Sequence, residues 1–581
     1  MNTSILAYLL GSAAAIGLLR WRFKKRPDTF GSAGWLPAWK ASGKRLFQSS
    51  GLLVGDWSGL LPVHYRGSGH ALTVAPTGSG KGTCAIIPNL LRHPWIFLID
   101  PGGENTAICA KEWQRKGHTF YCLNPWGMHS TAPWELPAHS INPLDILEPA
   151  AETFASDADL LAEMIVTRSG KDGGSAAYFK DEAQSGIRAF LMHIVTTEEK
   201  ERRNLLTLRQ YITSTGDNWD ALIAAMKKNK AAGGLIIREA AQLERRDLQA
   251  AEEFSAIMST MKQDTNFIED PVMQKALGAS TADLAALKGL QGGARIPGCA
   301  VSVVIPLEYI ETHAAYARLI VAAALWQMQR KPLARGRVLF LLDEFPALKR
   351  MDRIAGGLPT LRKYRVWLWP IVQNIGQLKN LYGQNWQTFM SNAGLKQFIG
   401  AGDLETAQHV SALCGETTVE TKTRNANNEV SISHARRPLA AVDEIMTMPS
   451  DRQIVFVDAL RPLWLRKTPY WHRPALHGLF NQNPYHSGTP RLSKWTVPQI
   501  VWGYGLRFCA WLVRPAPAVI AAAFMTFCWW GNAGIVGSTF RTGPDLVCNY
   551  QNVSKREAYR YRSVPRDFSC PHFVLFGNLF G

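Results

Sequence analysis

Residues 73–83, TVAPTGSGKGT, have the residue types and spacing of a loop that binds phosphate. The glycines allow sharp turns that direct several backbone N–H groups at one anion, and Lys81 adds a full positive charge. The apolar run 71–75 before the loop indicates a buried strand, and residues 85–87 after it begin a helix whose N-terminus attracts phosphate. We therefore expect the nucleotide-binding residues to be Thr77, Gly78, Ser79, Gly80, Lys81, Gly82 and Thr83.

Two positions depart from the usual pattern of such loops. Ala75 replaces the first glycine, and Gly82 replaces the Ser or Thr whose hydroxyl normally contacts magnesium. Thr83 is one residue late for that contact, so metal binding would need water or carboxylates from elsewhere. Taken alone, the segment also fits a glycine-rich surface turn beside one lysine.

A second motif favours nucleotide chemistry. Residues 338–346, VLFLLDEFP, form an apolar run that ends in Asp343 and Glu344. The run predicts a central parallel strand, and two carboxylates at its end are costly to bury unless they act on a ligand. We expect Asp343, with Thr83, to hold Mg2+, and Glu344 to orient and deprotonate the water that attacks ATP. Paired acids also occur in helix caps, but the two motifs together indicate an ATPase.

These groups need a parallel sheet to bring them together. Short apolar strands alternate with helical segments, which predicts an α/β fold with a mainly parallel sheet. Polar residues close three of the strands: Asp100, Asp343 with Glu344, and Gln373. Ligands of such sheets bind at the carboxyl ends of the strands, so we expect these residues to lie together. The predicted strands are 95–99, 119–123, 300–305, 338–342, 366–372, 397–399 and 454–457.

The long interval between the two motifs predicts an inserted domain. The chain has 32 prolines, yet none lies between Pro149 and Pro271, and apolar residues there recur at helical spacing. The expected divisions are a membrane anchor at 1–27, the first part of the nucleotide-binding domain at 28–175, an all-α domain at 176–290, the second part of the nucleotide-binding domain at 291–495, and a C-terminal apolar segment with a tail at 496–581.

Both ends of the chain carry apolar segments. Residues 5–19 are apolar apart from glycine and serine, and five basic residues follow between 20 and 26. A signal peptide places its positive charge first, so we predict an uncleaved transmembrane helix with the following chain in the cytoplasm. A second uncharged stretch, 515–540, is predicted to span the membrane again, although an interfacial or buried helix is the alternative.

The net charge of the chain indicates which kind of partner it binds, and the cysteines indicate whether it forms disulfides. The formal net charge is +18 and the pI is about 9.5, which suits DNA or an anionic lipid surface, although basic residues beside membrane segments can simply set topology. The nine cysteines form no CxxC pair. Cys548 and Cys570 could form a disulfide only if the tail crosses the membrane. The cysteines expected to be packing residues are Cys84, Cys109, Cys122, Cys299 and Cys414.

Several motifs follow one another along the chain: APTGSGKG at 75–82 followed by IIPNLL, IDPGGE at 99–104, NPLD at 142–145, LLDEFP at 341–346, VQNIGQLKNLYG at 372–383 and RPLAAVDEIMTMP at 437–449. In this order they resemble the motifs of the type IV coupling proteins, the membrane-anchored ATPases of conjugation and type IV secretion. The resemblance covers about residues 72–462. One departure is Gly102, where lysine is usual, and another is the single predicted N-terminal span where the family commonly has two.

This resemblance implies a RecA-like P-loop NTPase core and a homohexameric ring in the bacterial inner membrane, with most of each chain in the cytoplasm. It also implies that Gln373 senses the γ-phosphate and that Arg362 acts as an arginine finger across the subunit boundary. Arg362 could instead pair with a surface acid, and Gln373 could be a capping side chain.

Three functions remain open from the sequence. The first is an ATP-driven motor that recruits conjugative DNA with its relaxase and pumps it into a type IV secretion channel, in contact with inner-membrane components of that channel. The second is a docking receptor for protein effectors, in which ATP hydrolysis only gates handover. The third, a chromosome-partitioning DNA translocase, is disfavoured by the inserted helical domain and by the segment 372–383.

Overall fold

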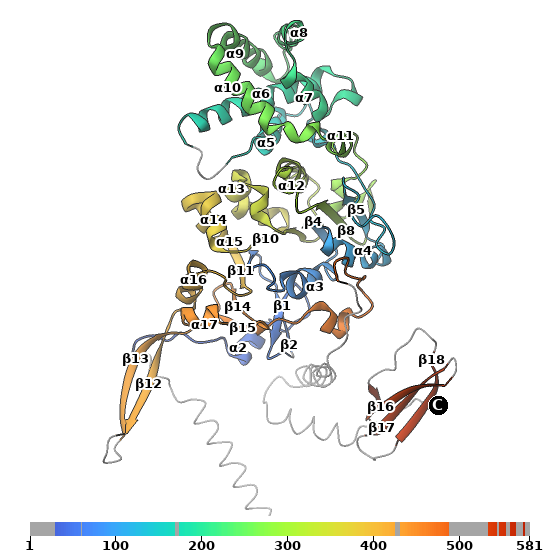
Figure 1. The fold of residues 1–581 in the computed structure, drawn as a ribbon, viewed down its shortest axis with the longest axis vertical. Coiled ribbons are helices and arrows are strands. Elements are labelled where there is room, and N and C mark those ends of the chain that lie inside the picture. The colour runs from blue at the N-terminus through green and yellow to red at the C-terminus, as the bar shows by residue number, and fades with distance from the viewer. Residues whose placement is uncertain are drawn as a thin grey trace, which may run out of the picture. The chain divides into compact units, whose positions relative to one another are not determined.

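The computed structural model describes residues 29–59, 61–168, 173–424 and 430–486, together with the backbone of four strands between 533 and 575 (Figure 1). The chain divides into two compact units. The larger unit holds nearly all residues up to Thr489, and the smaller unit holds the residues from Pro490 onward.

The larger unit is built on an eleven-stranded sheet with the order β2-β1-β15-β14-β11-β3-β10-β9-β4-β8-β5. The seven strands from β11 to β5 are parallel, while β14, β15 and β1 pair antiparallel beyond β11. The mainly parallel sheet is therefore confirmed, and every predicted strand lies in it. The strands are β1 Leu52–Trp57, β2 Leu61–Tyr65, β3 His70–Val74, β4 Trp95–Pro101, β5 Thr119–Leu123, β8 Cys299–Ile305, β9 Val338–Leu342, β10 Val366–Val372, β11 Ala393–Phe398, β14 Arg452–Val457 and β15 Leu463–Arg466.

The central strands are apolar throughout because both faces of the sheet are covered. In β9, Val338, Phe340 and Leu342 belong to one hydrophobic core, and Leu339 and Leu341 belong to another. Successive side chains of a strand point to opposite faces, so the two cores lie on the two sides of the sheet. The five cysteines predicted to be packing residues are all buried with free thiols, which confirms that expectation.

Different helices cover the two faces. The core that contains Leu339 is closed by the helical turn η1 (Gly82–Ile86), α3 (Ile87–Leu90) and α4 (Glu104–Arg115), which follow the phosphate-loop segment and β4. The core that contains Phe340 is closed by the other helices of this layer. These are α5 Phe154–Ile165, α12 Ala314–Gln329, α13 Asp352–Leu361, α14 Ile375–Tyr382, α15 Gln387–Asn392 and α16 Leu404–Cys414.

In the sequence, a group of helices lies between β5 and β8, and these helices form the top of Figure 1. Helix α5 joins this group to the sheet layer, because it packs against both α6 and α12. Residues 173–288 of the described chain contain no strand. The helices are α6 Ser175–Thr197, α7 Leu205–Thr213, α8 Asp217–Met226, α9 Leu235–Gln249, α10 Ala251–Asp264 and α11 Pro271–Ala276.

Three smaller features complete the larger unit. Strands β12 (Glu416–Arg424) and β13 (Val430–Pro438) form an antiparallel hairpin that projects from the body in Figure 1. Strands β6 (Leu290–Gln291) and β7 (Ala294–Arg295) form a second, very short hairpin. Helices α2 (Ala38–Gly43) and α17 (Val442–Met446) are short, and each contributes one buried residue, Ala41 and Ile445, to a core.

The smaller unit contains an antiparallel sheet with the order β18-β17-β16-β19, made of β16 Ala533–Thr542, β17 Asp545–Asn552, β18 Ala558–Val564 and β19 Phe573–Leu575. Residues 533–540 were predicted to end a transmembrane helix, and that part of the prediction is wrong. This segment contains Ile535, Val536 and Thr539, whose β-branched side chains favour a strand, and two glycines, which are unfavourable inside a helix.

None of the helices in the described part of the chain has the length and apolar character that a membrane crossing requires. The first predicted span, 5–19, and residues 515–532 of the second lie outside the described residues. Cys570 and the side chain of Cys548 also lie outside them, so the predicted spans and the disulfide stay predictions.

Candidate nucleotide site

The sheet order brings the predicted site residues to one edge. The glycine-rich loop follows β3, Asp343 and Glu344 follow β9, and Gln373 follows β10. Strand β10 lies between β3 and β9, and all three strands are parallel, so their carboxyl ends meet at the same edge. Gln373 is therefore placed between the loop and the acid pair.

Lys81 is the centre of this cluster. Its Nζ lies 2.8 Å from Asp343 Oδ1 and also donates a hydrogen bond to Glu344 Oε1. Gln373 Nε2 donates to the other oxygen of Glu344, at 3.1 Å. The four predicted side chains thus form one connected network. The left-handed backbone of Glu344, with φ of 51°, is uncommon for a residue with a side chain and marks a tightly specified turn.

The charges in this cluster depend on one another. Burial lowers the pKa of Lys81, but the adjacent carboxylates of Asp343 and Glu344 outweigh that effect and leave the pKa raised. Burial raises the pKa of Asp343, and the positive charge of Lys81 opposes the rise. About a fifth of the Lys81 side chain and a tenth of the Asp343 side chain are exposed, so both can reach a ligand that enters from solvent.

The loop itself has the geometry of an anion cradle. Gly78 and Gly80 have φ angles of 74° and 83°, a region that glycine adopts without strain. The hydroxyl of Ser79 is buried and has no hydrogen-bond partner among the described residues. A buried hydroxyl without a partner is unfavourable, so this atom points to a ligand that supplies the missing bond. In the helical turn that follows, the Cys84 N–H donates to the Gly80 carbonyl at 3.0 Å, and a helix leaves the N–H groups that precede it without an intrahelical partner.

The residues expected to hold magnesium are present but few. The Thr83 hydroxyl donates to the Gly80 carbonyl at 3.2 Å, which leaves its lone pairs available, and Asp343 offers one carboxylate. The described residues contain no cluster of three or more His, Cys, Asp or Glu side chains that could enclose a metal. This fits Mg2+, which is commonly bound through one or two carboxylates, nucleotide phosphates and water.

Asp100 lies near the carboxyl end of β4, at the same edge of the sheet, but its side chain has a structural role. Its carboxylate accepts from Thr106 N–H at 2.7 Å, from the Thr106 hydroxyl at 2.6 Å and from the Asn105 amide at 2.9 Å. Burial raises the pKa of Asp100 to about 6, although these hydrogen bonds oppose the rise. Its lone pairs are therefore used to hold the first turn of α4.

Arg362 is not part of this cluster. It lies in the turn η8 (Arg362–Tyr364), before β10, and therefore at the opposite edge of the sheet from Gln373. Strand β10 has seven residues, so about 20 Å separates the two edges, which is more than an arginine side chain can reach. The side chain is exposed and makes no ion pair or hydrogen bond within the described part of the chain. Any contact with a nucleotide would have to involve another subunit.

Sequence reasoning missed a second lysine at the loop. Lys467 Nζ donates to the Ser79 carbonyl at 2.8 Å, from the residue that follows β15. Burial lowers the pKa of Lys467. No local pattern around Lys467 identifies it, because its position depends on how β15 pairs in the sheet. Tyr485 was also missed, and its hydroxyl donates to the Gly102 carbonyl at 2.7 Å.

A large, mostly parallel sheet with a glycine-rich loop and a strand-end acid pair at one edge defines a P-loop type of α/β fold. A family model described as type IV secretory system conjugative DNA transfer matches residues 24–493. The chain therefore belongs to this family, that of the type IV coupling proteins.

Individual relatives agree with this assignment. The chain is 25% identical over 464 residues to the conjugal transfer protein TraG of Agrobacterium fabrum, which covers 77% of this chain and 66% of TraG. It is 26% identical over 425 residues to VirD4 of Rhizobium rhizogenes, which covers 71% of this chain and 60% of VirD4. The chain thus spans somewhat less than two thirds of the length of these relatives.

Solved structures show the same fold. The bacterial conjugative coupling protein TrwBdeltaN70, in an unbound form, matches with a TM-score of 0.59 and 15% identity over 77% of this chain and 95% of that one. TrwB in complex with ADP and Mg2+ matches with a TM-score of 0.57 and 16% identity over 77% of this chain and 96% of that one.

Proposed function

We propose that this chain is an ATP-driven coupling protein that recruits conjugative DNA with its relaxase and pumps it into a type IV secretion channel. The observation that carries the proposal is the convergence of Lys81, Asp343, Glu344 and Gln373 at the edge of the sheet where the glycine-rich loop lies. Family membership supports conjugation as the setting, and the solved TrwB complex with ADP and Mg2+ supports the choice of nucleotide and metal.

The hydrolytic step follows from the contacts in the cluster. When ATP enters, Lys81 exchanges its carboxylate partners for the terminal phosphates, and the N–H groups of the loop bind the same oxygens. Thr83 and Asp343 would hold Mg2+, which neutralises charge on the phosphates. Glu344, released from Lys81, is then available to accept a proton from the attacking water. Gln373 contacts Glu344 and can report the state of the γ-phosphate to β10.

The ring and its location are part of the same proposal. The exposed position of Arg362, about 20 Å from its own loop, supports a role as a finger that completes the site of a neighbouring subunit. A homohexamer anchored in the inner membrane, with contacts to channel components there, would place these sites around a central pore. The net charge of +18 supports passage of a polyanion.

The test uses the full chain in detergent and measures ATP hydrolysis with and without single-stranded DNA. A DNA motor should hydrolyse ATP severalfold faster when DNA is present, whereas a docking receptor should not respond. Lys81→Ala should abolish hydrolysis. Lys111→Ala, which removes an exposed lysine from α4, is the matched control and should retain it. A parental rate that is the same with and without DNA would refute the motor.

A further inference from the structure

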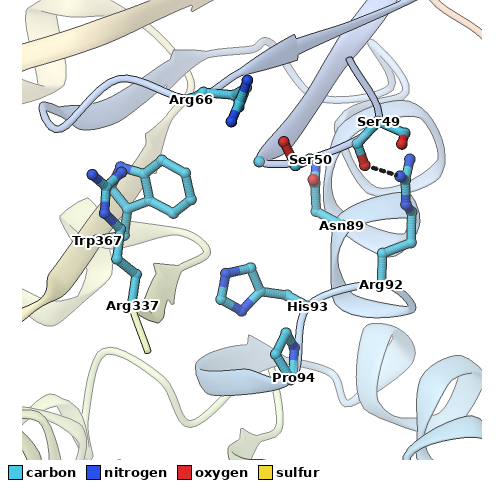
Figure 2. A pocket seen from close by; sticks show the side chains of 10 residues that line it. Ser49, Ser50, Arg66, Asn89, Arg92, His93, Pro94, Arg337 and Trp367 are labelled. Carbon is cyan, nitrogen blue, oxygen red and sulfur yellow. Dashed lines mark hydrogen bonds between the residues drawn. The ribbon is translucent and has the colours of Figure 1, made fainter. Parts of the chain in front are cut away.

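A basic cavity lies at the edge of the sheet opposite to the nucleotide site. It has a volume of about 400 Å3 and is open to solvent. Figure 2 shows Arg66, Arg92 and Arg337 on different sides of it, with His93 between Arg337 and Arg92 and with Trp367 beside Arg337. These residues come from distant parts of the chain, since Arg66 follows β2, Arg92 follows α3, Arg337 precedes β9, and Trp367 lies in β10.

Arg66 and Arg337 bring two positive charges to the cavity. None of its ten lining residues is acidic. Arg66 donates to the Gln48 amide oxygen, and Arg337 donates to the Gly67 carbonyl and packs 4.8 Å from the centre of the Trp367 ring. Neither forms an ion pair with a described residue. Arg92 is engaged with the protein, since it donates to the Ser49 carbonyl at 2.8 Å and is hydrogen-bonded to His64 Nε2 at 3.0 Å. Burial lowers the pKa of His93 to about 4, so the charge comes from the arginines.

The guanidinium groups of Arg66 and Arg337 face one open cavity that has no acidic lining residue, and an anion that enters it would meet both charges. Guanidinium forks match the geometry of phosphate oxygens, and the hydroxyls of Ser49 and Ser50 at the rim add further donors. The volume is at the small end of the range for ligand cavities, about 300–1,000 Å3, which suits one phosphate and its sugar better than a duplex. None of the lining residues is an exposed large apolar side chain, as insertion into a lipid surface would require.

We propose that this cavity binds a phosphodiester group of single-stranded nucleic acid. The inference rests on the proposed function, because it names a contact through which that motor would hold DNA. The cavity is also connected to the nucleotide site. Strands β9 and β10 run from the cavity to Glu344 and Gln373, and the helical segment that starts after Lys81 ends just before Arg92. Binding at one edge can therefore influence the other through elements that both sites share.

The test is binding of a fluorescently labelled 20-nucleotide single strand to the full chain, measured by anisotropy at several salt concentrations. The variant Arg66→Gln with Arg337→Gln removes two exposed guanidinium groups from the cavity. Each lost phosphate contact on a single strand lowers the log–log salt slope by about 0.7. The double variant should therefore lose about 1.4 in slope and bind roughly 25-fold more weakly at 0.1 M salt.

Two controls make the result specific. Arg238→Gln with Arg245→Gln removes the same charge from the exposed side of α9 and should change binding little. Arg66→Lys with Arg337→Lys keeps the charge and should restore most of the affinity. If the glutamine double variant binds the strand with the parental slope and affinity, the inference is wrong. It is also wrong if that variant loses only binding to phosphatidylglycerol vesicles, because the cavity then serves a lipid headgroup.

Measurements of ATP hydrolysis distinguish a failure of this inference from a failure of the proposed function. The glutamine double variant should keep the basal ATPase rate and lose its stimulation by DNA. If the parental chain binds the strand through the cavity but never hydrolyses ATP, the proposed motor fails and the cavity assignment stands. If the parental chain is stimulated by DNA and the double variant is stimulated equally, the cavity assignment fails and the motor stands.

Discussion

The replacement of Glu344 by glutamine tests the catalytic assignment most directly. The change keeps the size of the side chain and removes its ability to accept a proton. A general base contributes about 10²–10⁴-fold in rate, which corresponds to roughly 3–5 kcal/mol of barrier. We therefore expect ATP hydrolysis by Glu344→Gln to fall by at least a hundredfold.

The affinity for ATP should rise while the rate of hydrolysis falls. Lys81 loses one of its two carboxylate partners, so ATP competes with only Asp343 for the ammonium group. Exposed ion pairs contribute up to about 1 kcal/mol, which corresponds to roughly fivefold in affinity, and because this pair is only about one fifth exposed we expect a gain of at least that order. The new amide can keep both hydrogen bonds if Gln373 turns its own amide to present the oxygen.

The assay measures phosphate release at saturating ATP and, separately, the affinity for a fluorescent ATP analogue. The matched control is Glu405→Gln, which makes the same change in an exposed ion pair with Lys379 and should behave like the parent. Hydrolysis by Glu344→Gln within threefold of the parental rate would show that another group activates the water. Loss of nucleotide binding together with hydrolysis would show that Glu344 mainly supports the site.

Three further outcomes are expected. Arg362→Ala should bind ATP normally and hydrolyse it about a thousandfold more slowly. Mixing Arg362→Ala subunits with Lys81→Ala subunits should recover partial activity. If rings that demonstrably contain both subunits recover none, Arg362 is not a finger that acts in trans. Because burial raises the pKa of Asp100 from its ordinary 3.8 to about 6, the folded state binds this proton more tightly than the unfolded state, and stability from this group is lost as pH rises through 6. The loss is roughly 3 kcal/mol, and Asp100→Asn should flatten the pH dependence of the urea midpoint between pH 4 and 7, whereas parallel curves would contradict it. Arg473→Met should lower the free energy of unfolding by about 3–5 kcal/mol, because Asp56, paired with Arg473 at 2.6 and 3.1 Å, is left as a buried charge; an unchanged thermal midpoint would argue against this pair as a structural tie.

The sequence predicted the central strands well because of how they are buried. Strands β9 and β10 match their predicted ranges because a parallel strand covered on both faces is a continuous apolar run. Strand β11 begins four residues earlier than expected, since Gly394 and Lys396 interrupt its apolar pattern. Strand β1 was not predicted at all. The hairpin β12–β13 was not predicted either, because β13 is exposed along its whole length and has no buried apolar face.

The catalytic cluster could be predicted for a related reason. Lys81, Asp343 and Gln373 each follow an apolar strand, so a parallel sheet must bring them to one edge whatever the order of its strands. The sequence by itself therefore determined the fold class and the chemistry of that edge.

Only the tertiary structure decided which residues approach the cluster from elsewhere. Lys467 reaches the loop because β15 pairs with β1, and the paired residues Asp56 and Arg466 are about 400 residues apart in the sequence. The basic cavity has the same origin, since Arg66, Arg92 and Arg337 are ordinary surface arginines in the sequence. Local patterns encode the burial of a strand, but the meeting of distant loops depends on the order in which strands pair, and no single segment carries that information.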